Sequence, residues 1–218
     1  WFIKMSRENK KEAVAALHRR QIMISADRLF LEKGFVQTTI DDISKASEYS
    51  RRTIYSYYES KEDILYHIIE KGLLSLKANI STALSKSKDF LGRYHIICTA
   101  FKSYQYDSPI SVDSVIKAKP TAFNEKDIPE VIIRILSLGD EINQILASFI
   151  EDGIKQKVVR EDINPMATVY IMWSNISSLL SLVETKEMVI KKQLGMTDSE
   201  FLDYGYTQIV NSLLKERI

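Results

Sequence analysis

Helix-breaking residues are scarce in this chain, and their scarcity limits the folds open to it. Only 7 glycines and 4 prolines occur among 218 residues, and apolar residues recur at the spacing of an amphipathic helix over long stretches. Long runs of β-branched residues are few. We therefore predict an all-α protein of about nine helices, and its 45% of hydrophobic residues is enough for a sizeable core.

Cysteine content and charge narrow the class of protein further. A single cysteine, Cys98, excludes an internal disulfide framework and suits a reducing cytoplasm. No apolar run approaches the roughly 18 residues of a membrane span, so we expect a cytoplasmic protein without a membrane segment. Residues 1–62 hold 12 Lys and Arg against 9 Asp and Glu, which weakly favours a nucleic-acid partner for the N-terminal part.

A helix, a tight turn and a second helix are predicted between Thr38 and Lys61. Thr38 is placed to cap the first of these helices, with Asp41 at the reciprocal capping position three residues later. We expect that helix to end near Ser47. Ser50 can cap the second helix, which carries basic, hydroxyl and phenolic side chains close together. The pattern predicts a helix-turn-helix that reads DNA.

Each type of side chain in this stretch suits a different part of a DNA duplex. Arginine can donate two hydrogen bonds to guanine, and threonine offers a hydroxyl and a methyl group to a base. Phenols, the Lys61 ammonium and the amides at a helix start suit phosphate oxygens. We predict DNA contacts for Thr38, Thr39, Ser50, Arg51, Arg52, Thr53, Tyr55, Tyr57 and Lys61.

Some of these side chains have plainer alternatives. Tyr49, Tyr55 and Tyr58 suit a packing role in the core of the N-terminal domain better than a contact with DNA. A basic extension also precedes the domain, with Lys10, Lys11, Arg19 and Arg20. It suits either a solvated helix or an arm that touches phosphates or the minor groove.

The rest of the chain divides into further helices at polar or proline-containing breaks. The expected helices are one that begins after Ser60 and continues to about Ser85, one from Phe90 to Tyr106, a short one around Val112–Lys117, one from Pro129 to near Lys157, one capped by Asn164-Pro165, and one from about Asp198. The helix after Pro165 is apolar nearly all round, so we expect it to be buried on several sides.

The segment from Arg20 to Leu65 resembles the N-terminal domain of TetR-family transcriptional regulators. The resemblance is carried by an apolar helix ending in Gly34-Phe35, by TTIDDI at 38–43, by SRRTIYSYY at 50–58 and by SKED at 60–63. It implies a DNA-binding domain in residues 1–62 and a helical ligand-binding and dimerisation domain in residues 63–218.

The resemblance also implies roles for single residues. Thr39, Tyr57 and Lys61 would hold phosphates, and Arg51, Arg52, Thr53 and Tyr55 would lie on or beside the groove-facing surface. This chain departs from the family at the turn, where Ser47-Glu48 replaces the usual Ala-Gly. Glu48 must then adopt the turn geometry without glycine's freedom. Arg52 replaces a small residue, which we expect to shift the preferred operator sequence.

For the second domain, the resemblance around Gly153–Trp173 implies that the last two helices pair with those of a second subunit. Lys157 stands where the family often has glycine, which weakens the expected helix cap. We predict dimer contacts for Tyr170, Ile176, Leu180, Leu202, Tyr206, Ile209 and Leu213. A small-molecule effector would contact Tyr94, His95, Cys98, Phe101, Tyr104, Met172 and Trp173.

Catalytic and metal-binding motifs are missing from the sequence. His95 and Cys98 share a helix face, but two ligands are too few for a metal site, so we expect no metal and no cofactor. We therefore predict a homodimeric repressor that binds a palindromic DNA operator and is released by a small-molecule ligand. Two alternatives remain: a helical interaction protein that has lost DNA reading, which Glu48 favours, and a small-molecule enzyme.

Overall fold

The computed structural model describes residues 7–86, 89–111 and 128–216. Within these ranges it contains eight α-helices, and its extended pairing there is limited to one bridge between Val159 and Leu214. The all-α prediction is confirmed. The short helix predicted around Val112–Lys117 lies outside the described residues.

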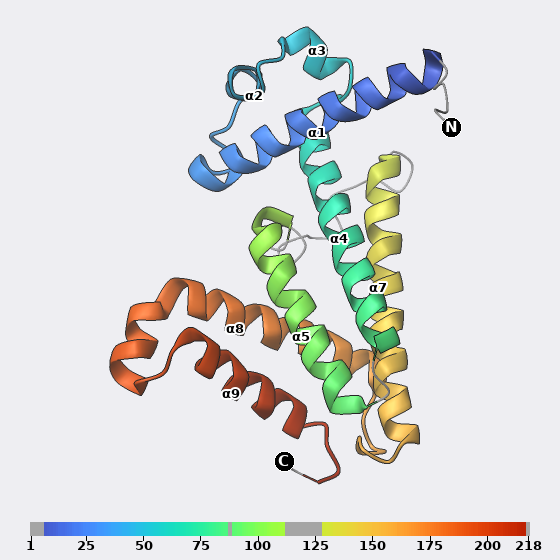
Figure 1. The fold of residues 1–218 in the computed structure, drawn as a ribbon, viewed down its shortest axis with the longest axis vertical. Coiled ribbons are helices and arrows are strands. Elements are labelled where there is room, and N and C mark those ends of the chain that lie inside the picture. Colours follow the sequence, from blue (N-terminus) through green and yellow to red (C-terminus); the bar gives the residue numbers. More distant parts are fainter. Residues whose placement is uncertain (1–6, 87–88, 112–127, 217–218) are drawn as a thin grey trace, which may run out of the picture. The chain divides into compact units, whose positions relative to one another are not determined.

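Most helix limits agree with those expected from sequence (Figure 1). The N-terminal extension and the first predicted helix form one continuous helix, because no breaker separates them. The helices are α1 (Arg7–Lys33), α2 (Ile40–Ser47), α3 (Arg51–Tyr55), α4 (Lys61–Lys86), α5 (Phe90–Asp107), α7 (Glu130–Lys155), α8 (Pro165–Leu194) and α9 (Asp198–Asn211).

The chain forms two compact units. The N-terminal unit comprises residues 1–71 and 108–135, and the C-terminal unit comprises residues 72–107 and 136–218. The sequence predicted a domain boundary between residues 62 and 63, whereas the N-terminal unit extends to residue 71 and includes the first turns of α4. The reason is that Ile64 and Ile68 of α4 are buried in the same core cluster as α1.

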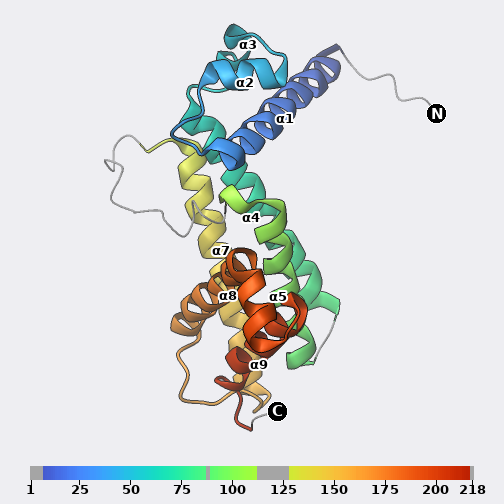
Figure 2. The same ribbon diagram turned by 90° about the vertical axis from the view of Figure 1, so that its left-hand side faces the viewer.

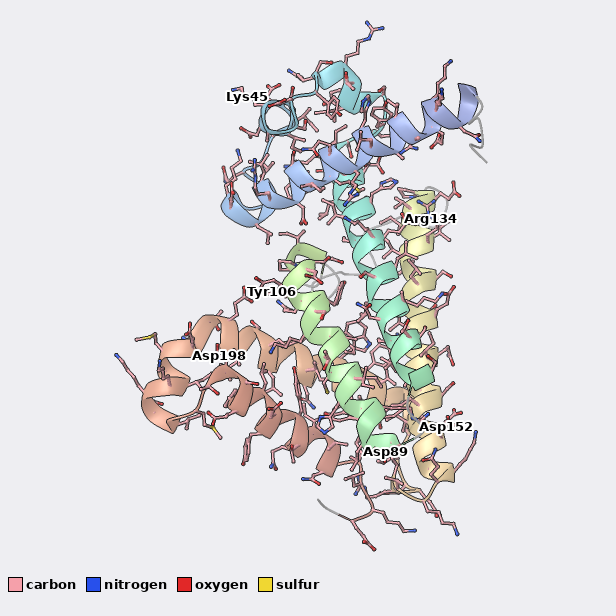
Figure 3. All side chains as sticks on the ribbon, viewed as in Figure 1. Lys45, Asp89, Tyr106, Arg134, Asp152 and Asp198 are labelled. Carbon is pink, nitrogen blue, oxygen red and sulfur yellow. The ribbon has the colours of Figure 1, made fainter. Side chains whose placement is uncertain are left out.

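The N-terminal unit contains α1, α2, α3 and the first turns of α4 (Figure 2), and side chains of these helices form one apolar core. Ile22, Ala26 and Phe30 of α1 face this core, as their spacing predicts. Two polar contacts support it. The Tyr58 hydroxyl donates to the Arg19 carbonyl at 3.1 Å, and Arg134, at the start of α7 (Figure 3), donates to both carboxylate oxygens of Glu70 on α4. The buried members of the cluster are Ile22, Ala26, Phe30, Ile43, Ile54, Tyr58, Ile64 and Ile68.

In the C-terminal unit, α8 and α9 lie side by side and both pack on α5 (Figure 1). Asn164 caps α8 through the Ala167 amide at 2.9 Å, with Pro165 in the first turn, as predicted. The backbone leaves helical geometry at Lys186, where α8 kinks. By length and composition α8 could cross a membrane, so the expectation that no segment approaches such a span is wrong. Only a third of the apolar window of α8 is buried, so the expectation that this helix is buried on several sides is wrong as well.

Candidate nucleic-acid interface

Helix α2 begins one residue later than the sequence suggested. Its cap is Thr39, whose hydroxyl accepts from the Asp42 amide at 3.2 Å, while Asp42 accepts from the Thr39 amide at 2.8 Å. Thr38 is 1% exposed, and its hydroxyl donates to the Gly34 carbonyl at 2.9 Å. The predictions that Thr38 caps the helix with Asp41 and contacts DNA are therefore wrong, because its hydroxyl is buried and already bonded.

The two acidic residues of α2 have different partners. Lys33 lies 2.6 Å from Asp42, and this ammonium, with the hydroxyl and amide of Thr39, holds the pKa of the Asp42 carboxyl well below its usual range. Asp41 points elsewhere and pairs with Arg51 of α3, with Nη1 and Oδ1 3.3 Å apart. Asp42 therefore closes the start of α2, and Asp41 connects α2 to α3.

The turn between α2 and α3 depends on a strained residue. Glu48 ends α2 with φ +63°, in the left-handed region, as expected at the position where the family resemblance implies a glycine. The Ser44 hydroxyl donates to the Tyr49 carbonyl at 2.6 Å across this turn. Lys157 has φ +61° in the same way after α7.

Replacing Glu48 by glycine is expected to stabilise the protein by about 1 kcal/mol, because glycine enters the left-handed region without a Cβ clash. Glu48→Gln is the matched control, since it removes the charge but keeps the Cβ. Urea unfolding of both variants measures the difference. A glycine variant no more stable than the glutamine variant would contradict the strain at Glu48.

Helix α3 presents its polar residues outward. Ser50 caps it by accepting from the Thr53 amide at 3.1 Å, and the two hydroxyls are 2.9 Å apart. Arg51 and Arg52 are exposed. Tyr55 is 50% exposed while Ile54 is fully buried, so Ile54 rather than Tyr55 supplies the packing side of this helix. Tyr58 does belong to the core.

Tyr57 and Lys61 are tied into the N-terminal unit. The Tyr57 hydroxyl lies 3.0 Å from His18 Nδ1 on α1, a partner that sequence reasoning missed. The Lys61 ammonium donates to the carbonyls of Phe35 and Thr38, both at 2.8 Å, which leaves one of its three N–H groups. Tyr57 therefore ties the segment after α3 to α1, and Lys61 ties the start of α4 to the segment before α2.

The surface that α2 and α3 present carries hydroxyl, basic and acidic side chains together. It contains Lys45, an exposed residue in the last turn of α2 (Figure 3) that the sequence interpretation did not single out. Two cationic side chains at the start of a short helix, with hydroxyls beside them, can donate to base edges and phosphates. The exposed members are Thr39, Asp41, Lys45, Glu48, Ser50, Arg51, Arg52 and Tyr55, and Thr53 is half-buried.

The candidate effector residues of the C-terminal unit mostly fill its interior. Tyr94, Cys98, Phe101, Tyr104 and Met172 are buried. The Tyr94 hydroxyl donates to the Tyr206 carbonyl at 3.0 Å, and Trp173 Nε1 donates to Asn143 at 3.0 Å. His95 is exposed on the outer side of α5, so its assignment to an internal pocket is wrong.

Burial in this interior predicts a loss of stability in alkali. Burial raises the pKa of the Cys98 thiol to about 12 and raises the pKa values of Tyr94 and Tyr206 above their ordinary range. In the unfolded chain these groups lose protons near pH 9 to 10, while the native groups stay protonated. Stability should therefore be unaffected at neutral pH and fall as pH rises above about 9.

Urea unfolding between pH 7 and pH 11 tests this dependence. Cys98→Ala removes the group with the lowest unfolded pKa, so the decline should begin at higher pH in that variant. A decline that starts at the same pH in both proteins would show that the thiol does not contribute.

A groove runs along the exposed side of α8 and α9. Its volume is about 520 Å³, and its apolar lining includes Leu182 and Tyr204, which are 40% and 57% exposed. Gly205 brings the two helices close, since a Cβ there would lie 2.7 Å from Leu179. The lining residues are Asn175, Ser178, Leu179, Leu182, Phe201, Tyr204, Gly205, Gln208, Ile209 and Ser212.

The predicted dimer residues fall on both sides of α8 and α9. Tyr170 is 60% exposed and Ile209 lines the groove. The prediction that the other five residues contact a second subunit is wrong, because they are buried in the core of their own chain. These residues are Ile176, Leu180, Leu202, Tyr206 and Leu213. Because α8 is apolar nearly all round, its composition could not tell the core face from the free face, and the sequence interpretation did not single out Leu179, Leu182, Phe201 and Tyr204, which line the groove.

Comparisons with known proteins agree with this arrangement. Residues 22–68 match the model of bacterial regulatory proteins of the tetR family. The chain is 23% identical over 154 residues to the HTH-type transcriptional regulator YhgD of Bacillus subtilis, which covers 71% of this chain and 78% of YhgD. Over 50 residues it is 40% identical to IcaR of Staphylococcus epidermidis, a negative transcriptional regulator of a biofilm operon, covering 23% of this chain and 27% of IcaR.

A solved structure has the same fold over most of the chain. The TetR-family transcriptional regulator PfmR of Thermus thermophilus superposes with a TM-score of 0.65 at 20% identity. The match covers 86% of this chain and 96% of PfmR.

Proposed function

This chain belongs to the TetR family of bacterial transcriptional regulators, and we propose that it is a homodimeric, ligand-released repressor of a palindromic operator. The family places it among DNA-binding regulators, not enzymes. As a regulator of bacterial genes it would act in the cytoplasm, where its DNA lies. IcaR, with which it shares the N-terminal segment, is described as a negative regulator.

The observation that carries the DNA-binding part is the surface of α2 and α3. Arg51 and Arg52 are exposed at the start of α3, and Thr39 is exposed at the start of α2. Guanidinium groups at the N-terminal end of a helix are well placed to meet base edges in the major groove. Direct phosphate contacts from Tyr57 and Lys61 belong to this proposal, with His18, Phe35 and Thr38 as their supports.

The groove on α8 and α9 supports the dimer. Exposed apolar side chains continue beyond it on α8, including Tyr170 and Ile171 at 60% and 59%. Exposed apolar side chains that gather on one face are typical of an interface between subunits. A two-fold dimer would present two α3 helices about one DNA turn apart, roughly 34–36 Å, and would therefore bind a palindrome.

Ligand release is proposed as a shift between two states. A small molecule that enters the aromatic interior near Tyr94, Phe101, Tyr104 and Met172, with Trp173 beside them, would have to repack these buried residues. It would lower DNA affinity only if it bound the non-DNA-binding state more tightly. Near-complete release requires a preference of about 5.5 kcal/mol.

Selection of duplexes from a random-sequence library by the purified full-length protein tests the proposal. We expect recovery of an inverted repeat bound with strong salt dependence, as phosphate contacts require. Arg52→Ala should relax base preference within each half-site. Absence of any sequence-selective duplex would refute the repressor and favour a helical interaction protein, whereas turnover of a small molecule without DNA affinity would favour an enzyme.

A further inference from the structure

We propose that Asp41 sets the base preference of the α2–α3 surface by holding the Arg51 guanidinium in position for a guanine. The inference rests on the proposed DNA-binding function and adds one specificity-determining residue to it. Asp41 would not need to touch DNA itself, so it is a positioning residue. Its role follows from which atoms it contacts and which it leaves free.

The contact joins two helices at the exposed surface. Asp41 is in the first turn of α2, Arg51 is the first residue of α3, and Oδ1 and Nη1 are 3.3 Å apart. Their side chains are 59% and 61% exposed, so both reach solvent. The capped start of α2 and the Ser50 cap of α3 fix the two backbones, and the ion pair then limits where the guanidinium can point.

Neighbouring residues lack this arrangement. Asp42 is already committed to Lys33 and to the cap of α2. Arg52 has no ion-pair partner among the residues that the structure describes, so its guanidinium keeps its freedom to reach a base or a phosphate. Arg51 is therefore the arginine whose direction the protein sets before DNA arrives.

The remaining donors of Arg51 match guanine. A guanidinium has five N–H groups, and the ion pair with Asp41 is made at Nη1, so the Nε and Nη2 groups can still donate to a base. Guanine offers two acceptors in the major groove, N7 and O6, whereas adenine presents an amino donor in place of O6. An arginine that is already ordered loses less conformational freedom on binding, and it is less free to turn from a mismatched base to a phosphate.

The Asp41 carboxylate should oppose binding that does not depend on sequence. Its charge lies on a surface that meets phosphates, so it repels any duplex. Asp41→Asn should therefore raise affinity for random duplex while it lowers guanine preference. A role limited to the helix dipole of α2 would not shift affinity and preference in opposite directions.

The experiment uses the full-length protein and the inverted repeat recovered by selection. Binding of wild type, Asp41→Asn, Arg51→Ala and the double variant is measured at one salt concentration on that duplex, on duplexes with each guanine pair changed to adenine, and on random duplex. We expect Asp41→Asn to lower guanine preference at one symmetric position about 3- to 10-fold, and to raise random-duplex affinity about 2-fold. Arg51→Ala should abolish the preference at the same position.

Two further comparisons make the test specific. Asp41→Asn should have no added effect on base preference in the Arg51→Ala background, because the pair acts as one unit. Asp198→Asn, which removes an acid from the first turn of α9, should leave DNA binding unchanged. The inference is overturned if Asp41→Asn keeps the guanine preference of the wild type. It is also overturned if Asp41→Asn lowers base preference by the same factor in the Arg51→Ala background. Neither result would contradict the proposed repressor function. A wild-type protein that selects no sequence overturns both.

Discussion

Leu182→Asp is expected to separate the dimer into monomers and to lower operator affinity by about 10²- to 10⁴-fold, the gain that joining two binding modules provides. Leu182 lines the groove on α8 and α9. In a two-fold interface each substitution occurs twice, so two carboxylates would be buried without partners. Each half-site contact would remain, but the two would no longer be coupled.

Sedimentation and duplex-binding measurements test this result together. Leu136→Asp is the matched control, because Leu136 is 56% exposed on α7 and lies outside the groove. It should leave both dimerisation and operator binding unchanged. If Leu182→Asp stays dimeric, or if the control dissociates equally, the groove is not the interface. Retained half-site binding by monomeric Leu182→Asp would show that its DNA-binding domain is folded.

Gly153→Ala is expected to destabilise the C-terminal unit by about 1–3 kcal/mol through overpacking. A Cβ at Gly153 on α7 would lie 2.5 Å from both Phe90 and Val159. Phe90 cannot easily yield, because it is fully packed and stacks on Phe149 with ring centroids 4.5 Å apart. The glycine is therefore required by close helix packing and not by backbone geometry.

Gly139→Ala on the same helix is the control, and its effect on stability should have the opposite sign. No atom lies within 4 Å of a Cβ added at Gly139. Alanine should therefore stabilise α7 by about 0.5–1 kcal/mol through helix propensity alone. Thermal unfolding of the two variants should move in opposite directions. A stabilising Gly153→Ala would mean that α5 and α7 do not pack as closely as the structure shows.

The DNA-binding surface was partly predictable because some of its features are local. The Ser50 cap and the left-handed Glu48 involve residues within a few positions of each other. A hydroxyl three residues before an amide can be recognised without the fold, and the family resemblance marked position 48 as one where the turn usually has glycine. The exposure of Arg51 and Arg52 at the start of α3 followed from the same local pattern.

Other features of the site depend on residues far apart in the sequence. Lys61 donates to the carbonyl of Phe35, 26 positions away, and Tyr57 meets His18, 39 positions away. Thr38 and Thr39 are adjacent and chemically equal, and only the packing of α1 against α2 buries the first and exposes the second. No local signal could have distinguished them.

Breakers, caps and apolar spacing act over a few residues, so the helical class, most helix limits and the position of the helix-turn-helix could be predicted without the fold. The tertiary structure alone decided which face of α8 is core and which lines the groove. That helix is apolar nearly all round, so its faces become different only when α5 and α9 cover one of them. The contact of Asp41 with Arg51 likewise required α2 and α3 to be placed together.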